Sequence, residues 1–192
     1  MDYLDTLRLV VLNPEQFLKE LEKEEKARPA VVFLILSAFF NAIGITIVYF
    51  LFFWAITTYA THSSSSIPVW NFVPFILVAV LFTILSFIGW FLYALIIHLL
   101  AFLFKRDIKF SRTFQIVAYG SASYFLFSLI PIFGLLSIFY TVYVVAIGIA
   151  KFHKLEMPKA VAVASIPLVI WLVVVLLIIF SIFVPLTRTV LY

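Results

Sequence analysis

The amino-acid sequence predicts an all-α membrane protein, a polytopic bundle of transmembrane helices. Hydrophobic residues make up 66% of the 192 residues and charged residues only 11%, whereas a soluble domain has about 25% charged residues. The charges are also segregated, because the stretches 29–104, 113–150 and 160–187 contain no Asp, Glu, Lys or Arg. Each stretch is long enough to cross about 30 Å of hydrocarbon. None alternates polar and apolar residues as barrel strands do, so we expect helices.

Residues 1–28 predict a cytoplasmic amphipathic segment of one or two short helices. Asn13 can cap a helix that starts at Pro14, and Gln16 completes a capping box. An apolar stripe follows, formed by Phe17, Leu18 and Leu21. Three interpretations of this stripe remain open: a helix in water, a helix on the membrane surface, or a helix folded back on the basic loops of the membrane domain.

The membrane domain is expected to cover residues 29–187 and to contain five spans. The first uncharged run, 29–104, is too long for one crossing, and the polar sequence THSSSSIPVWN at 61–71 divides it. The run 113–150 would be about 57 Å long as a single helix, and Pro131 cannot continue a helix normally. We therefore predict two spans there, the alternative being a re-entrant hairpin that returns without reaching the far side. The predicted spans are about 30–57, 72–104, 113–130, 132–150 and 160–185.

The distribution of positive charge predicts that the N-terminus lies inside and the C-terminus outside. With five spans, residues 1–28, 105–112 and 151–159 lie on the cytoplasmic side and hold 12 of the 13 Lys and Arg residues. Cytoplasmic loops carry this excess of basic residues. The two basic loops would also attract anionic head groups, at about 1 kcal/mol per charge. The candidate head-group contacts are Lys105, Arg106, Lys109, Arg112, Lys151, Lys154 and Lys159.

Polar residues inside the predicted spans have two interpretations, helix packing and a polar pathway. Helices in lipid associate through small residues and interhelical hydrogen bonds. Four predicted faces carry such residues: Ser37, Asn41 and Gly44; Gln115, Tyr119 and Ser123; Ser137, Thr141 and Gly148; Ala160, Ala164 and Trp171. The functional alternative is a pocket or pathway lined by Asn41, Gln115 and Tyr119. The candidate intramembrane residues are Asn41, His98, Gln115, Tyr119, Ser123 and Pro131.

His98 is the only ionisable residue besides tyrosines that we place within a span. Such a residue is a functional hypothesis by default, but His98 is close enough to Lys105 to lie at the inner interface and hydrogen-bond a carbonyl. The other two histidines, His62 and His153, fall in predicted loops without a partner at ligand spacing.

Three short motifs and their order resemble a known family. NPEQFLKEL at 13–21 precedes the first span, AYGSASYFLFSLIP at 118–131 lies in the third, and HKLEMPKAVAVASIP at 153–167 leads into the last. Over roughly residues 10–185 the chain resembles a prokaryotic-type member of the Yip domain family, the Ypt/Rab-interacting proteins.

The resemblance implies a fold of five spans and a non-enzymatic class. Tyr119, Gly120 and Pro131 occupy the places of the tyrosine, glycine and proline of the family's third span. The D-L-Y-G-P signature that eukaryotic members carry near the first span is absent, and RPAVVFLI stands there instead.

The residues themselves also argue against an enzyme. The chain has no Cys, no Asp or Glu within the predicted spans, and no phosphate-binding glycine loop, so no catalytic residue, metal site or cofactor is expected. We expect a non-catalytic integral membrane protein of a prokaryotic cell membrane. Its expected partners are the bilayer, anionic lipids at the cytoplasmic face and other membrane proteins, as homo- or hetero-oligomers, but no nucleic acid. The alternative is a small-molecule or ion transporter or channel.

Overall fold

The described part of the chain, residues 2–61 and 72–190 of a computed structural model, is built from α-helices. Four are long: α3 (Arg28–Thr61), α4 (Phe72–Phe104), α7 (Pro131–His153) and α8 (Met157–Val190). Four are short: α1 (Tyr3–Leu12), α2 (Pro14–Leu21), α5 (Phe110–Gly120) and α6 (Ala122–Phe127). Each long helix contains a stretch long and apolar enough to cross a membrane. The predicted class, a multi-pass helical membrane protein, is therefore confirmed.

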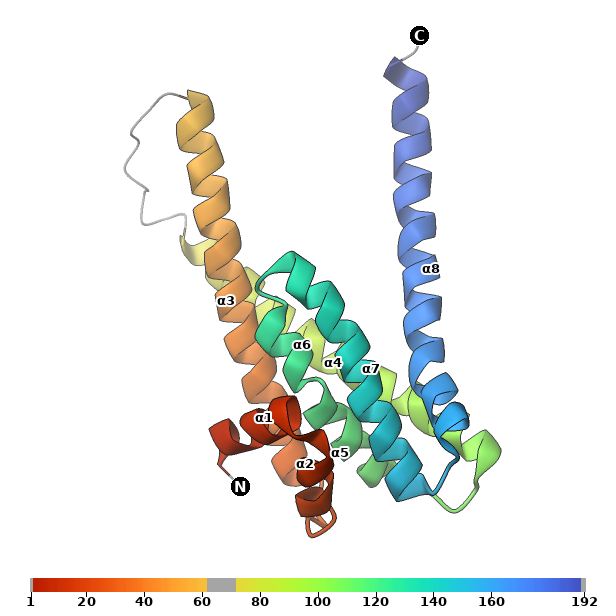
Figure 1. The fold of residues 1–192 in the computed structure, drawn as a ribbon. Coiled ribbons are helices and arrows are strands. Elements are labelled where there is room, and N and C mark those ends of the chain that lie inside the picture. Colours follow the sequence, from red (N-terminus) through yellow and green to blue (C-terminus); the bar gives the residue numbers. More distant parts are fainter. Residues whose placement is uncertain (1, 62–71, 191–192) are drawn as a thin grey trace.

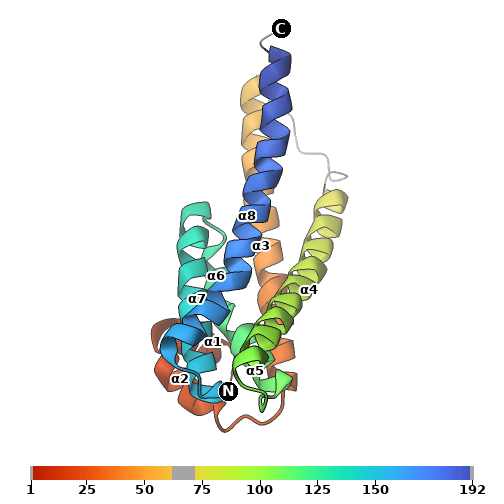
Figure 2. The same cartoon turned by 90° about the vertical axis from the view of Figure 1, so that its right-hand side faces the viewer.

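The helices pack together at one end of the bundle and diverge toward the other (Figures 1 and 2). We call the packed end the basic end and define it by the connections 22–27, 105–109 and 154–156. α1, α2 and α5 lie there, together with the first turns of α3 and α8. Toward the opposite end, α3 and α8 extend beyond the turn between α6 and α7 (Figure 1).

The predicted third span, 113–130, is divided in the structure. α5 ends at Gly120 and α6 begins at Ala122, although the amide of Ser121 still donates to the Val117 carbonyl at 3.0 Å. The chain then reverses, and α7 begins at Pro131, since proline has no N–H to donate and suits the first helical position. The predicted turn at 61–71 lies, from residue 62 onward, outside the described residues.

The N-terminal helices fold back on the bundle. Asn13 ends α1 and caps α2, because its Oδ1 accepts from the amide of Gln16 at 3.1 Å. The apolar stripe of α2 is buried, and the ring of Phe17 lies edge-on to Tyr119 of α5, with centroids 5.1 Å apart. This stripe therefore packs on protein, and neither water nor lipid covers it.

The core lies in the half of the bundle next to the basic end. Among side chains that the structure describes, the buried residues of α3 lie at or before Ala42, those of α4 at or after Ala94, and those of α8 at or before Pro167. Gly148 brings α7 against α5 so closely that a Cβ there would meet Ile116 Cγ2 at 2.5 Å. Most residues of the three other predicted faces are buried, although Ser123 of the second face lies in α6 and not in α5. On α8 the packing ends before Trp171, which is 56% exposed.

Candidate functional site

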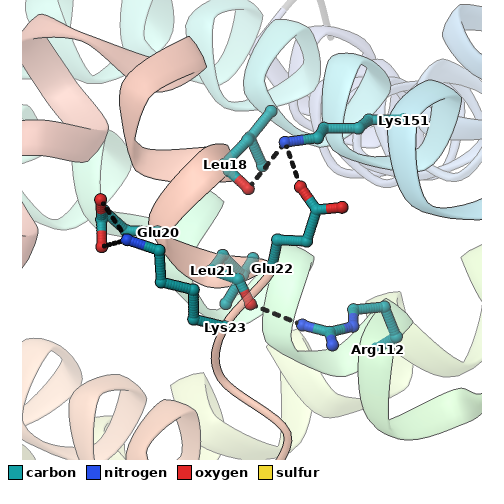
Figure 3. Close-up of polar contacts among 7 residues, drawn as sticks. All are labelled: Leu18, Glu20, Leu21, Glu22, Lys23, Arg112 and Lys151. Carbon is teal, nitrogen blue, oxygen red and sulfur yellow. Dashed lines mark hydrogen bonds and ion pairs between the residues drawn. The ribbon is translucent and has the colours of Figure 1, made fainter.

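The N-terminal segment is attached to the basic end by two cations. We call residues 3–27 the cap. Lys151 Nζ of α7 lies 3.1 Å from Glu22 Oε2 and donates to the Leu18 carbonyl at 3.1 Å. Arg112 Nη1, in the first turn of α5, donates to the Leu21 carbonyl at 2.8 Å. Figure 3 shows both side chains directed at the end of α2. The last carbonyls of a helix carry partial negative charge, so cations stabilise this end.

A second set of contacts joins the connection after α2 to the middle of α5. The Tyr119 hydroxyl donates to both carboxylate oxygens of Glu24, at 2.9 and 3.1 Å. Gln115 Nε2 donates to Glu24 Oε1 at 3.2 Å and to the Lys26 carbonyl at 2.9 Å. Residues four apart on a helix share a face, so both buried side chains reach the same connection. The sequence pointed to Gln115 and Tyr119, but gave no sign that Glu24 is their partner.

A pocket of about 390 Å³ lies between the cap and the first turns of α3. Its lining includes Tyr3, Glu24, Arg28, Val32, Phe33 and Tyr119. The Phe33 ring centroid lies 5.1 Å from that of Tyr3 and 5.0 Å from that of Tyr119, so three aromatic rings support this region. Within residues 2–61 and 72–190, neither Glu24 nor Arg28 takes part in an ion pair. The pocket thus combines a carboxylate, a guanidinium and apolar side chains.

Three polar side chains link the ends of α4, α5 and α7. Thr113 Oγ1 lies 3.1 Å from His98 Nδ1 and 2.8 Å from His153 Nε2. A hydroxyl carries one hydrogen, so Thr113 can donate to only one of the two imidazoles, and at least one of them donates its ring N–H to Thr113. The prediction that His153 lies in a loop is wrong. α7 continues to His153, which is buried, and ends where Lys154 adopts a left-handed conformation with φ of 53°.

Asn41 lies in a different cluster from Gln115 and Tyr119. Its Nδ2 donates to the Phe125 carbonyl at 2.8 Å and also to Ser128 Oγ. The last carbonyls of a helix have no intrahelical partner, so Asn41 satisfies the end of α6. Its Oδ1 is buried and has no hydrogen-bond partner in residues 2–61 and 72–190. The three residues proposed to line a pathway therefore belong to two separate hydrogen-bonded sites.

The remaining predicted residues are spread over the bundle. Ser123 Oγ lies 2.9 Å from Thr141 Oγ1 and joins α6 to α7, and Pro131 opens α7. Lys159 Nζ lies 3.1 Å from Glu156 Oε2, three residues earlier in the chain. For the other four basic residues, no ion pair or side-chain hydrogen bond occurs in the described part of the chain. These are Lys105, Arg106, Lys109 and Lys154.

Comparison with known proteins gives one match. The family model of the Yip1 domain matches residues 8–179, a range that includes most of the cap, both charged residues of the pocket, Glu24 and Arg28, and the linked side chains of His98, Thr113 and His153. No curated protein and no solved structure matches the chain.

Proposed function

The chain belongs to the Yip1 domain family, and on that premise we propose that it is a non-catalytic multi-pass membrane protein that binds or organises other membrane components. The observation that carries this proposal is how the bundle uses its polar side chains. Besides the contacts above, the Tyr93 hydroxyl of α4 donates to the Ala164 carbonyl of α8 at 2.8 Å. In lipid, such bonds join helices. Nowhere in residues 2–61 or 72–190 do three His, Cys, Asp or Glu side chains gather as metal ligands.

The far half of α8 is the surface we assign to lateral association. Val169, Ile170, Trp171, Leu172, Val173 and Val174 are all between 47% and 56% exposed. Consecutive helical residues point in all directions, so this part of α8 has no neighbour on any side within the described residues. It suits contact with apolar helices of other membrane proteins or of a second copy.

Photo-crosslinking in native membranes tests this association. A photoreactive residue at Val173 should give discrete protein adducts, since this side chain is exposed on an unpacked helix. The matched control is Val163, which is buried on the same helix and should crosslink only within the chain. Adducts to lipid alone at Val173 would count against an interaction role.

The proposal includes five crossings, with the N-terminus inside and the C-terminus outside. In support, the connections 22–27, 105–109 and 154–156, each of which contains Lys or Arg, gather at one end of the bundle (Figure 1), as the positive-inside rule requires. α5 and α6 together supply the third crossing, and α7 the fourth. The four basic residues without a protein partner would face anionic head groups on the inner side, in a prokaryotic cell membrane.

Thiol labelling in intact cells tests this topology, because the chain has no native cysteine. Ser64→Cys and Ile132→Cys are expected to react with an impermeant reagent from outside, and Lys109→Cys only after permeabilisation. An unreactive Ile132→Cys would favour the re-entrant hairpin. Labelling of Lys109→Cys in intact cells would show that the orientation is the opposite of the one proposed.

Reconstituted vesicles test the transport alternative. The protein is expected to leave the leak of ions and small dyes at the level of protein-free vesicles, because Asn41 lies apart from Gln115 and Tyr119. A substrate-specific flux that disappears in Asn41→Leu or Gln115→Leu would overturn the non-transporting assignment.

A further inference from the structure

We propose that the pocket between the cap and α3 binds the head group of an aminophospholipid, with Arg28 on the phosphate and Glu24 on the primary ammonium. This assignment goes beyond an interaction role, because it names a small ligand and its site. It also stands on observations other than the exposed half of α8.

Glu24 supplies a fixed negative charge that the described protein does not neutralise. Its carboxylate accepts hydrogen bonds only from neutral groups, the Tyr119 hydroxyl and the Gln115 amide. A carboxylate offers about four lone-pair sites, so acceptor capacity remains for an ammonium group. Because α5 holds the carboxylate in place, little further ordering is needed when a cation binds.

Arg28 also lines the pocket and supplies the opposite charge. It is the first residue of α3 and its side chain is exposed. A guanidinium matches the geometry of a phosphate group, and the N-terminus of a helix favours an anion. With no carboxylate of the described chain in ion-pair contact, the guanidinium is available to a phosphate.

The arrangement of α3 points to a lipid rather than to a soluble ligand. Arg28, Val32 and Leu36 follow one another at intervals of four residues, so they form one stripe along the helix, and all three line the pocket. The stripe begins with a cation at the first residue of a candidate membrane span and continues with apolar side chains. A phospholipid has the same order, a charged head group followed by acyl chains.

The size and chemistry of the pocket favour ethanolamine over other head groups. A volume of about 390 Å³ falls within the roughly 300–1,000 Å³ of small-molecule sites. A primary ammonium can donate hydrogen bonds to Glu24, as a lysine does, whereas the trimethylammonium of choline has no N–H. A glycerol head group carries no cation to meet Glu24. We therefore expect phosphatidylethanolamine to bind more tightly than phosphatidylcholine or phosphatidylglycerol.

Native mass spectrometry of the full, delipidated chain tests this preference. The protein is titrated with the three phospholipids, all with the same acyl chains. Phosphatidylethanolamine is expected to bind about tenfold more tightly than the other two, the scale of one hydrogen bond to a charged group. Glu24→Gln should remove this difference. Arg28→Gln should weaken the binding of all three lipids to the same extent.

Two further variants separate binding from folding. Glu25→Gln makes the same change of charge one residue away, at an exposed position outside the pocket, and should keep the preference. Val32→Trp fills the apolar part of the pocket and leaves both charges in place. It should lower the affinity for phosphatidylethanolamine severalfold. Thermal unfolding of each variant establishes that it is folded.

Three results would overturn the assignment. They are equal binding of the three lipids by the unchanged protein, an undiminished preference in folded Glu24→Gln, and displacement of the lipid by an equal concentration of free O-phosphoethanolamine. The last result would identify a soluble ligand. None of these results alters the crosslinking expected at Val173, so this proposal and the proposed function can fail separately.

Discussion

The long helices of this bundle are apolar along their length, yet their buried side chains, among those that the structure describes, lie in the half at the basic end. The contrast exists within single helices, because on α8 Val163 is 0% exposed whereas Val173 is 49% exposed. What differs is the distribution of small residues. Alanine occupies positions 160, 162 and 164 of α8, and no Ala, Gly or Ser occurs from 166 to 180.

This difference shows that the residues that insert a helix into the bilayer are not the residues that pack it against other helices. Hydrophobicity places a helix in the bilayer, but it gives no preference for protein over lipid, because lipid tails are as apolar as leucine. Helices approach one another where small side chains allow contact and polar side chains find partners. On α8 the small residues are concentrated beside the basic end, and residues 169–174 present apolar surface to their surroundings.

The largest expected effect comes from enlarging a glycine in the packed half. Gly148→Leu should lower the free energy of unfolding by about 1–3 kcal/mol, the usual cost of overpacking. The new side chain collides with Ile116, whose branched side chain has little rotamer freedom. The measurement is SDS-induced unfolding in mixed micelles.

The matched control for this change is Gly89→Leu on α4. A Cβ at Gly89 has no neighbouring atom within 4 Å, so the free energy of unfolding should change by less than about 0.5 kcal/mol. Equal losses in the two variants would show that the loss at Gly148 does not come from the contact with Ile116.

A smaller loss is expected when the hydroxyl between the two histidines is removed. Thr113→Val leaves His98 and His153 without their shared partner, and should reduce the free energy of unfolding by about 1–3 kcal/mol, toward the lower part of that range. Thr83→Val is the control, because the Thr83 hydroxyl donates only to the Ala79 carbonyl of its own helix, at 2.8 Å. If Thr113→Val leaves the free energy of unfolding unchanged, the contacts among His98, Thr113 and His153 do not stabilise the basic end.

Loosening the cap should lower the free energy of unfolding only a little, but it should clearly speed amide hydrogen exchange in α2. Lys151→Gln removes the pair with Glu22, and exposed pairs contribute about 0.2–1 kcal/mol. Amide hydrogen exchange should accelerate in α2, while α4 is unchanged. Lys159→Gln breaks a pair within the start of α8 and should leave exchange in α2 as it is. Unchanged exchange in Lys151→Gln would assign attachment of the cap to its apolar contacts alone.

The smallest effect is expected in the far half. Val173→Ala should change the free energy of unfolding by less than about 0.5 kcal/mol, because the side chain is 49% exposed. A loss of more than about 1 kcal/mol would reveal a stable contact with a second copy in the micelle. Chemical crosslinking of the same sample would then detect the dimer.

Much of the fold could be predicted from the sequence because its signals are local. Uncharged runs predicted long helices, Asn13 predicted the start of α2, and Pro131 predicted the chain reversal before α7. The break at Ser121 could not be predicted, since neither proline nor a charge marks it. The end of α7 was also missed. Lys151 and His153 belong to a charged segment that suggested a loop, but the helix continues and buries the imidazole.

The candidate site was predicted only in part because its partners are distant in sequence. Helical spacing placed Gln115 and Tyr119 on one face, and both lie there. Glu24 is 95 residues from Tyr119, and no periodicity connects the two. The same holds for Lys151 and the end of α2. Contacts of this kind depend on how the helices pack, and one chain's pattern of residues does not contain that information.

The attachment of the cap has a consequence for synthesis on the ribosome. The Leu18 carbonyl meets Lys151 across a separation of 133 residues, so α2 leaves the exit tunnel long before its docking surface exists. At about 5–20 residues per second the delay is roughly 7–27 s. Throughout that interval the stripe of Phe17, Leu18 and Leu21 needs temporary cover from lipid or a chaperone. Closure of the cap is therefore among the last steps of maturation, and it reports that α5 and α7 have already come together.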